Sequence, residues 1–200
     1  MITSFAGSFA IVLLLAQTAF AGEVNGMLSS RLDFYPDHAD GTGSEGRSAE
    51  LKIDAFHDFD ESRIVGEFIF RGDKKDSGRR ITEARQAYIR TPFAGFDVFV
   101  GNRQEFWGKA ESKNVVDVIN QSDAAANDGK SGKLGAPSIS AERYLDIGDL
   151  QLWYISAFRE KTFNDSHAHP SSGVPVISAQ YARKDDKDAD DFAARLSSFA

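Results

Sequence analysis

Three groups of residues in this chain have types and spacings that could support chemistry. The acidic run at residues 185–191 could coordinate Ca²⁺, but it lacks the sixth-position glycine and the closing glutamate of an EF-hand loop. His167 and His169, together with Asp165, alternate as ligands on a strand would, yet the sequence fixes no further ligand. Serine and histidine are both present, but no Gly-x-Ser-x-Gly elbow, paired carboxylates or phosphate-binding loop occurs. We therefore expect two solvated loops, and no enzymatic activity, metal or cofactor.

Charged residues at alternate positions of extended segments form a more informative pattern. Opposite charges lie close together within these segments, as in Arg31 with Asp33 and Lys52 with Asp54. Such a face suits a wet channel interior, where rings of opposite charge set a transverse field that selects solutes. The predicted pore-lining residues are Arg31, Lys52, Asp54, Glu67, Arg71, Arg103 and Glu105. The alternative is that these residues cover one solvated face of a sheet.

The positions between these charged residues are apolar. Successive side chains of a strand point to opposite sides of the sheet, so each segment has one polar and one apolar face. The residues expected to face outward to lipid are Leu28, Leu51, Ile53, Ile64, Phe68, Phe70, Phe96, Val98 and Val100. If a strand ran unbroken to residue 109, Trp107 and Lys109 would share the polar face with Arg103 and Glu105.

The mature chain reads as a series of short strands. The predicted strands cover residues 26–35, 48–57, 63–71, 80–91, 95–107, 139–147, 149–159, 174–183 and 191–199. Short connections at 58–62 and 148–149 contain Asp and Gly, which suit tight turns. The other connections are long and polar, at 36–47, 72–79, 121–137, 161–173 and 184–190. Short turns that alternate with long loops are typical of an outer-membrane barrel, so we predict an all-β antiparallel meander of about nine strands.

Alternation alone does not separate a membrane barrel from a soluble β-sandwich, which also has one wet and one dry face. A mean hydropathy of −0.35 is ordinary for a barrel. Aromatic residues near segment ends, namely Tyr35, Trp107, Trp153 and Tyr154, suggest an interfacial girdle. We favour the barrel. A soluble periplasmic β-protein that binds a small ligand, and a barrel enzyme with a Ser–His pair at its rim, remain alternatives.

The N-terminus has the features of a secretory signal. Residues 9–16 are an uncharged apolar run, and Ala19-Phe20-Ala21 gives a small-x-small cleavage pattern before Gly22. We predict a signal peptide at 1–21 and one domain at 22–200, with an N-terminal membrane anchor as the alternative. The chain has no cysteine, which excludes disulfides and a lipoprotein anchor. The formal charge of −7 argues against nucleic acid as a partner.

Four sequence motifs between residues 84 and 120 are the most distinctive in the chain. They are ARQAYIR at 84–90, GFDVFVGNRQ at 95–104, FWGKA at 106–110 and VVDVIN at 115–120. Together they resemble a family of porin-like outer-membrane proteins of Gram-negative bacteria, and 141–152 looks like the next hairpin of that family. The resemblance implies a large outer-membrane β-barrel that contacts lipid and passes small solutes. By the same analogy, residues 111–120 would fold inward as a constriction.

Strand number bears on whether the barrel can close. Bacterial single-chain barrels have an even number of strands, whereas about nine segments are predicted here. Members of the family are also several hundred residues long. We therefore expect this chain to be the N-terminal part of a larger barrel, with a complete small barrel as the alternative. On the first reading, the strands near 27–35 and 191–199 should not pair with each other.

Overall fold

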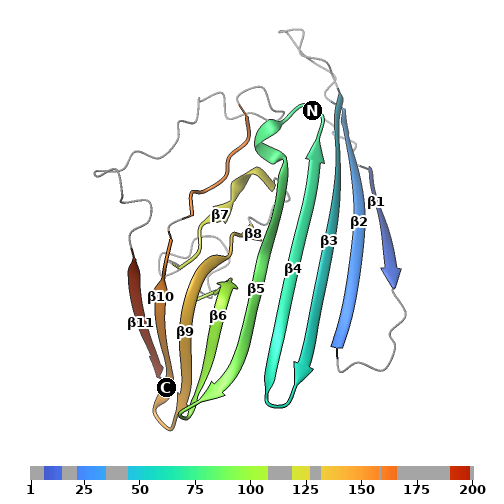
Figure 1. Cartoon of the computed structure of the whole chain (residues 1–200). Helices are drawn as coiled ribbons and strands as arrows, with labels where there is room; N and C mark the ends of the chain where they lie inside the picture. The colour runs from blue at the N-terminus through green and yellow to red at the C-terminus, as the bar shows by residue number, and fades with distance from the viewer. Residues whose placement is uncertain are drawn as a thin grey trace, which may run out of the picture.

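The structure is a computed structural model that describes residues 7–14, 22–34, 45–107, 119–126, 132–157, 159–165 and 190–198. Its main element is one antiparallel sheet of nine strands (Figure 1). In spatial order these are β1 (Gly7–Leu14), β2 (Gly22–Phe34), β3 (Glu45–Phe59), β4 (Ser62–Asp73), β5 (Ile81–Phe93), β6 (Phe96–Arg103), β9 (Ala136–Leu145), β10 (Gly148–Ile155) and β11 (Asp191–Ser198). Neighbours in the chain are neighbours in the sheet, except that β6 pairs with β9 across the segment that holds β7 (Ser122–Asp123) and β8 (Gly132–Lys133). The expected all-β antiparallel meander is confirmed.

Eight of the nine predicted strands coincide with β2–β6 and β9–β11, and the predicted strand at 174–183 lies outside the described residues. The additional strand is β1, which pairs with β2 from Gly7 opposite Leu32 to Leu14 opposite Asn25. This strand falls within the predicted signal peptide. Cleavage before Gly22 would remove it and leave β2 at the edge of the sheet.

Three two-residue turns lie at one end of the sheet, the lower end in Figure 1. They are formed by residues 60–61, 94–95 and 146–147. Asp60 has a φ of 49°, and Ala94 and Gly95 have φ values of 52° and 80°. In the 94–95 turn, positive φ at both central residues matches the right-handed twist of the flanking strands. The described connection at 74–80, which holds the 3₁₀ turn η1 (Ser77–Arg79), lies at the opposite end. The turn predicted at 148–149 lies instead at 146–147, because Gly148 and Asp149 begin β10 and pair with β9. The long loops predicted at 36–47 and 184–190 lie mostly outside the described residues.

The register of the ladders places the predicted apolar residues on one face. Leu28 lies opposite Leu51, which lies opposite Phe70, and the next row joins Ile53 to Phe68. On β6 the same face carries Phe96, Val98 and Val100. These side chains do not converge on a dry core: Leu28 is 45% exposed and Phe70 is 41% exposed. We name this surface the apolar face.

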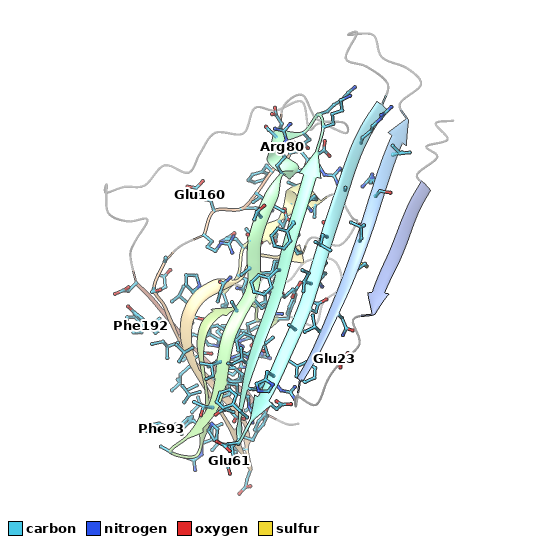
Figure 2. All side chains as sticks on the ribbon, turned by 45° about the vertical axis from the view of Figure 1, so that its right-hand side comes forward. Glu23, Glu61, Arg80, Phe93, Glu160 and Phe192 are labelled. Atoms are coloured by element: carbon cyan, nitrogen blue, oxygen red, sulfur yellow. The ribbon has the colours of Figure 1, made fainter. Side chains whose placement is uncertain are left out.

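Exposure of aromatic side chains extends to the borders of the sheet. Phe93 lies at the hairpin end and is 72% exposed, and Phe192 of β11 is 79% exposed (Figure 2). Phe192 packs beside Tyr154 of β10 on the apolar face, with their ring centroids 5.2 Å apart. Tyr154 lies near the end of β10, its place in an interfacial girdle stays a prediction, and Tyr35 lies outside the described residues.

The two tryptophans were predicted to join an interfacial girdle, and that prediction is wrong. Trp153 is 3% exposed and Trp107 is 9% exposed. Trp153 lies opposite Ser140, on the face that carries the charged residues, where it packs in a buried cluster with Trp107 and Ile119. The proximity of Trp153 to a strand end therefore does not place it at an exposed border of the sheet.

The polar face is the opposite side of the same sheet. Asp54 lies opposite Glu67 and Glu50 opposite Arg71, while Lys52 shares their side of β3. Arg31 and Arg103 occupy the same side on β2 and β6, so the predicted charged residues of the strands share one face. Strand β6 ends at Arg103, which corrects the expectation of a strand through residue 107. Lys109 lies outside the described residues.

A β-bulge interrupts the alternation between β4 and β5. Glu67 pairs with Gln86, but Phe68 pairs with Ala84, so Arg85 is the extra residue. A bulge of this kind lets two successive side chains point to nearly the same side. Gln86 donates a hydrogen bond to Glu67, and Arg85 forms an ion pair with Asp123 on the same face. The bulge thereby adds a cation that strict alternation assigns to the apolar face.

The sheet is open in the part of the chain that the structure describes. Strand β1 pairs only with β2, and β11 pairs only with β10. The expectation that the strands near 27–35 and 191–199 do not pair is therefore confirmed for the described residues.

Candidate functional site

An inward segment, formed by residues 119–126 and 132–135, lies against the polar face. It contains β7, β8 and the 3₁₀ turn η2 (Ala124–Ala126). Asn120 fastens its start: its side-chain amide donates to the carbonyl oxygens of Arg103 at 2.9 Å and Leu134 at 3.0 Å, and its oxygen accepts from the backbone N–H of Glu105. Leu134 is only 1% exposed. Residues 119–120 therefore lie against the polar face, whereas 111–118 lie outside the described residues, and the constriction expected at 111–120 stays a prediction.

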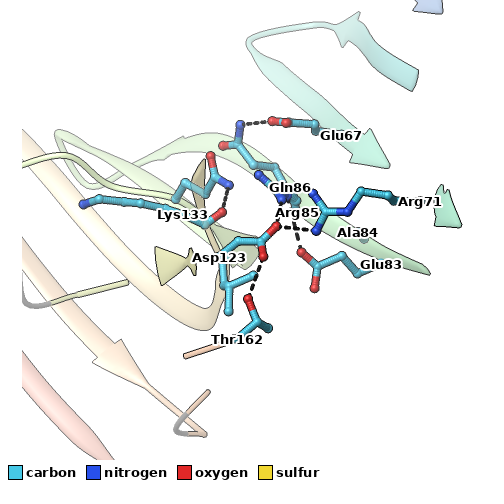
Figure 3. Close-up of polar contacts among 12 residues, drawn as sticks. Glu67, Arg71, Glu83, Ala84, Arg85, Gln86, Asp123, Lys133 and Thr162 are labelled. Atoms are coloured by element: carbon cyan, nitrogen blue, oxygen red, sulfur yellow. Dashed lines mark hydrogen bonds and ion pairs between the residues drawn. The ribbon is translucent and has the colours of Figure 1, made fainter. Parts of the chain in front are cut away.

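Asp123 is the most deeply buried charged residue of the inward segment, with no exposed surface. Its Oδ2 accepts hydrogen bonds from Arg71 Nη2 at 2.9 Å and from Arg85 Nη2 (Figure 3). Its Oδ1 accepts a hydrogen bond from the hydroxyl of Thr162 at 2.6 Å. We name this arrangement the Asp123 clasp. It joins β4, β5, the inward segment and residues 159–165 at one carboxylate.

The pKa of Asp123 reflects opposing effects. Burial alone would raise the pKa, because it removes water from the charged form. The hydrogen bond from Thr162, the charge and hydrogen bond of Arg71, and the charge of Arg85 act in the other direction and are together larger. The pKa of Asp123 therefore lies below its ordinary value, and the residue is a carboxylate at neutral pH.

Further carboxylates and carbonyl groups surround the arginines of the clasp. Arg71 also donates through Nε to the carbonyl oxygen of Arg79 at 2.7 Å, and its Nη1 lies 3.4 Å from Glu50. Arg85 Nε lies 3.5 Å from Glu83, which also accepts a hydrogen bond from Arg159. Positive and negative charges therefore alternate through the site. This compensation is needed because an unpaired charge is costly at such burial.

A second polar centre lies on β6 and β9 around Arg103. Its guanidinium donates to the Ser140 hydroxyl at 2.9 Å, to Glu105 at 2.9 Å and to Glu142 at 2.5 Å. The same group lies 3.7 Å from the ring centroid of Phe99 and 4.9 Å from that of Trp153. Arg103 and Glu105 were both predicted as site residues, and the structure brings them together although Glu105 lies beyond the end of β6.

A third centre lies on β3 and β4. Lys52 Nζ is 3.0 Å from Glu67 and 3.5 Å from Asp54, and Glu67 also accepts a hydrogen bond from Gln86 at 2.9 Å. The side chain of Asp54 is 48% exposed, whereas that of Glu67 is 13% exposed. The structure therefore gathers Lys52, Asp54 and Glu67 into one exposed network, and it covers Arg71 beneath the inward segment.

Sequence reasoning missed Asp123, Arg85, Asn120 and Glu142. Alternation reveals charges on strands, but Asp123 belongs to a polar connection, where an aspartate is unremarkable. Arg85 reaches the polar face only because of the bulge. Within the described ranges, no group of three or more His, Asp or Glu residues could hold a metal ion. His167, His169 and residues 185–189 lie outside those ranges.

No helix in the described part of the chain is long and apolar enough to cross a membrane. Comparisons with protein-family models, curated proteins and solved structures gave no match.

Proposed function

We propose that this chain forms wall strands of an outer-membrane β-barrel channel that passes small solutes. One observation carries the proposal: a single sheet has an exposed apolar face on one side and an ion-paired polar face on the other. The resemblance of residues 84–120 to porin-like proteins agrees with this assignment. The predicted signal peptide at 1–21 supplies the route of export.

The apolar face supports a lipid environment on energetic grounds. Leu28, Ile64 and Val100 are each exposed by more than two fifths of their surface, and they lie on a continuous side of the sheet. Contiguous apolar surface of this kind is a liability in water, whereas hydrocarbon solvates it without cost. The faces of a soluble sheet differ as well, but the apolar one is normally covered.

Strand length supports the same assignment. Strands β2, β3, β4 and β5 have 13, 15, 12 and 13 residues. A tilted transmembrane β-strand needs about 9–11 residues to cross the hydrocarbon core. Each of these four strands is long enough to span the bilayer and extend beyond it on the side of the long loops.

The polar face supports a wet interior. Its cations are paired with carboxylates, as in Lys52 with Glu67 and Arg103 with Glu142. Because the paired charges largely cancel, this face creates no strong electrostatic potential of one sign that would repel or trap passing ions. The inward segment lies across this face and would narrow the passage beside β4, β5 and β6. A narrowed passage favours small solutes over folded polymers.

Localisation and conductance together test the proposal. We would express the full-length protein, the product of the complete reading frame that encodes this chain, with an epitope tag in a Gram-negative host and separate outer membranes from osmotic-shock fluid. We expect the protein in the detergent-extracted outer-membrane fraction, and stepwise KCl conductance after reconstitution into planar bilayers. Residues 1–200 alone have open sheet edges at β1 and β11 and should not conduct; steady conductance from them would show a complete small barrel. Recovery in the shock fluid, without conductance, would contradict the channel and favour the soluble ligand-binding alternative.

A further inference from the structure

A row of aromatic side chains crosses the polar face near the hairpin end. Phe56 of β3 lies opposite Val65 of β4, which lies opposite Tyr88 of β5. The Tyr88 ring meets Phe99 of β6, with centroids 5.9 Å apart and planes tilted by 60°. All four side chains are partly exposed. Three of the four are aromatic, and Val65 lies between Phe56 and Tyr88; we name Phe56, Val65, Tyr88 and Phe99 the aromatic row.

A glycine makes the space in which the Tyr88 side chain lies. Gly101 is paired with Tyr88 and has a φ of 134°, which L side chains rarely adopt. A Cβ added at Gly101 would lie 2.2 Å from the carbonyl oxygen of Ala87 and 2.8 Å from the Cα of Tyr88. The backbone of β6 therefore approaches β5 closely beneath the row, where a side chain would interrupt the surface.

Ion pairs border the row on its own face. Arg63 forms two hydrogen bonds with Asp58, and Arg90 donates to Asp97 at 2.7 Å. The Arg63 guanidinium also lies 4.6 Å from the ring centroid of Phe56. On the other side of the row lies the Arg103 centre, with Glu105 and Glu142 as its carboxylate partners. The Arg103 guanidinium lies 3.7 Å from the ring centroid of Phe99, so Phe56 and Phe99 each have one ring face covered by an arginine.

The charges of this surface are matched. Arg63, Arg90 and Arg103 each have a carboxylate partner within hydrogen-bond distance. An ionic solute gains most from unpaired charges of the opposite sign, and these arginines offer none. Guanidinium and carboxylate groups nevertheless keep strong donors and acceptors at their edges, which can bind hydroxyl groups.

We propose that the channel binds neutral carbohydrate chains along the aromatic row. This inference rests on the proposed channel function and names its substrate class. A pyranose ring has an apolar C–H face that stacks on an aromatic ring and a rim of hydroxyls that both donate and accept hydrogen bonds. The row supplies the aromatic surface, and the paired arginines and carboxylates supply the partners for the rim. Binding sites for small molecules commonly combine an apolar lining with a few placed polar groups.

The inference that the channel binds carbohydrate is tested by measuring how far an oligosaccharide reduces the ionic current. The full-length protein in planar bilayers carries KCl current while maltohexaose is titrated against it. We expect a saturable block of the current by maltohexaose. The control is a polyethylene glycol of the same hydrodynamic size, which lacks the hydroxyl groups along a sugar chain. It should block the current more weakly and without saturation.

Variants locate the binding surface. Tyr88→Ala and Phe99→Ala should each raise the half-blocking sugar concentration by about tenfold, from the energy typical of one aromatic contact. Tyr88→Phe keeps the ring and should stay close to wild type. Phe70→Ala removes an aromatic residue from the apolar face and is the matched control, because it should leave the block unchanged.

The outcomes separate this inference from the proposed function. KCl current with no more block by maltohexaose than by the polymer would overturn carbohydrate binding and leave the channel intact. A saturable block that Tyr88→Ala and Phe99→Ala do not weaken would overturn the role of the row. Absence of any KCl current would contradict the channel, and the inference with it.

Discussion

Replacing Asp123 by asparagine removes one negative charge from the centre of the clasp and changes the side-chain shape very little. The side chains of Arg71 and Arg85 are 4% and 8% exposed, so water cannot solvate the charges that lose their partner. Breaking a buried ion pair by removing one partner typically costs about 3–5 kcal/mol. Glu50 and Glu83 remain within 3.5 Å of the two guanidiniums, which places the expected loss near the lower limit, at about 3 kcal/mol of unfolding free energy.

Equilibrium unfolding of the lipid-reconstituted protein in guanidinium chloride measures this loss of unfolding free energy. The chain contains two tryptophans, Trp107 and Trp153, and both are buried in the cluster beside the inward segment. Their fluorescence therefore reports directly on the detachment of that segment from the polar face. The midpoint should move to lower denaturant concentration in Asp123→Asn, with the slope unchanged if only stability is altered.

Asp58→Asn is the matched control. It breaks the pair with Arg63, whose side chain is 45% exposed, and water screens such a pair, so the loss of unfolding free energy should be far smaller than at the buried clasp. If Asp123→Asn costs no more than Asp58→Asn, the clasp does not hold the inward segment. Thr162→Val serves in case Asp123→Asn fails to fold, because it removes a single hydrogen bond to Asp123 and should cost about 1 kcal/mol.

The pKa of Asp123 in the folded protein is lowered, so the carboxylate stabilises the fold only while it is charged. Its contribution to the unfolding free energy is complete above the unfolded pKa of about 3.9, and it is lost as the pH falls through the folded pKa. The difference in unfolding free energy between wild type and Asp123→Asn should therefore be constant from pH 7 to about 5 and shrink below about 4. Leu51→Arg, in the middle of β3 on the apolar face, should cost about 2–4 kcal/mol in lipid vesicles. Ser29→Arg adds the same charge on the polar face, opposite Glu50, and should cost little; equal costs would contradict the lipid-facing assignment. Gly101→Ala should lower stability by about 1–3 kcal/mol in the same unfolding assay, since its φ and the nearby Ala87 carbonyl both oppose a Cβ. Mass spectrometry of the exported protein should give Gly22 as the first residue, and an intact Met1 would contradict cleavage.

The two faces of the sheet could be predicted because alternation is a local property. Within β3, the order Leu51, Lys52, Ile53, Asp54 fixes which side chains point together once the segment is extended. Pairing between strands then follows from turns of two residues, which set the register of each hairpin. Neither step requires knowledge of distant parts of the chain.

The Asp123 clasp could not be predicted in this way. Asp123 is 52 residues from Arg71 and 38 residues from Arg85, and neither spacing has a sequence signature. Arg85 follows Ala84 and precedes Gln86, so strict alternation gives Arg85 and Gln86 opposite faces. Only the register shift opposite Glu67 and Phe68 brings both to the polar face.

Beside the hydrogen bonds of Asn120, two chemically different attachments hold the inward segment. At Asp123 the attachment is ionic, and because it is buried, added salt should screen it far less than a surface pair. At Ile119 the attachment is apolar, through a buried cluster with Trp107 and Trp153 that contains no titratable group. Loss of the carboxylate charge therefore weakens one attachment and leaves the other in place. For this reason we expect the segment to behave as part of the channel wall, and its release to require the loss of both attachments and of the Asn120 hydrogen bonds.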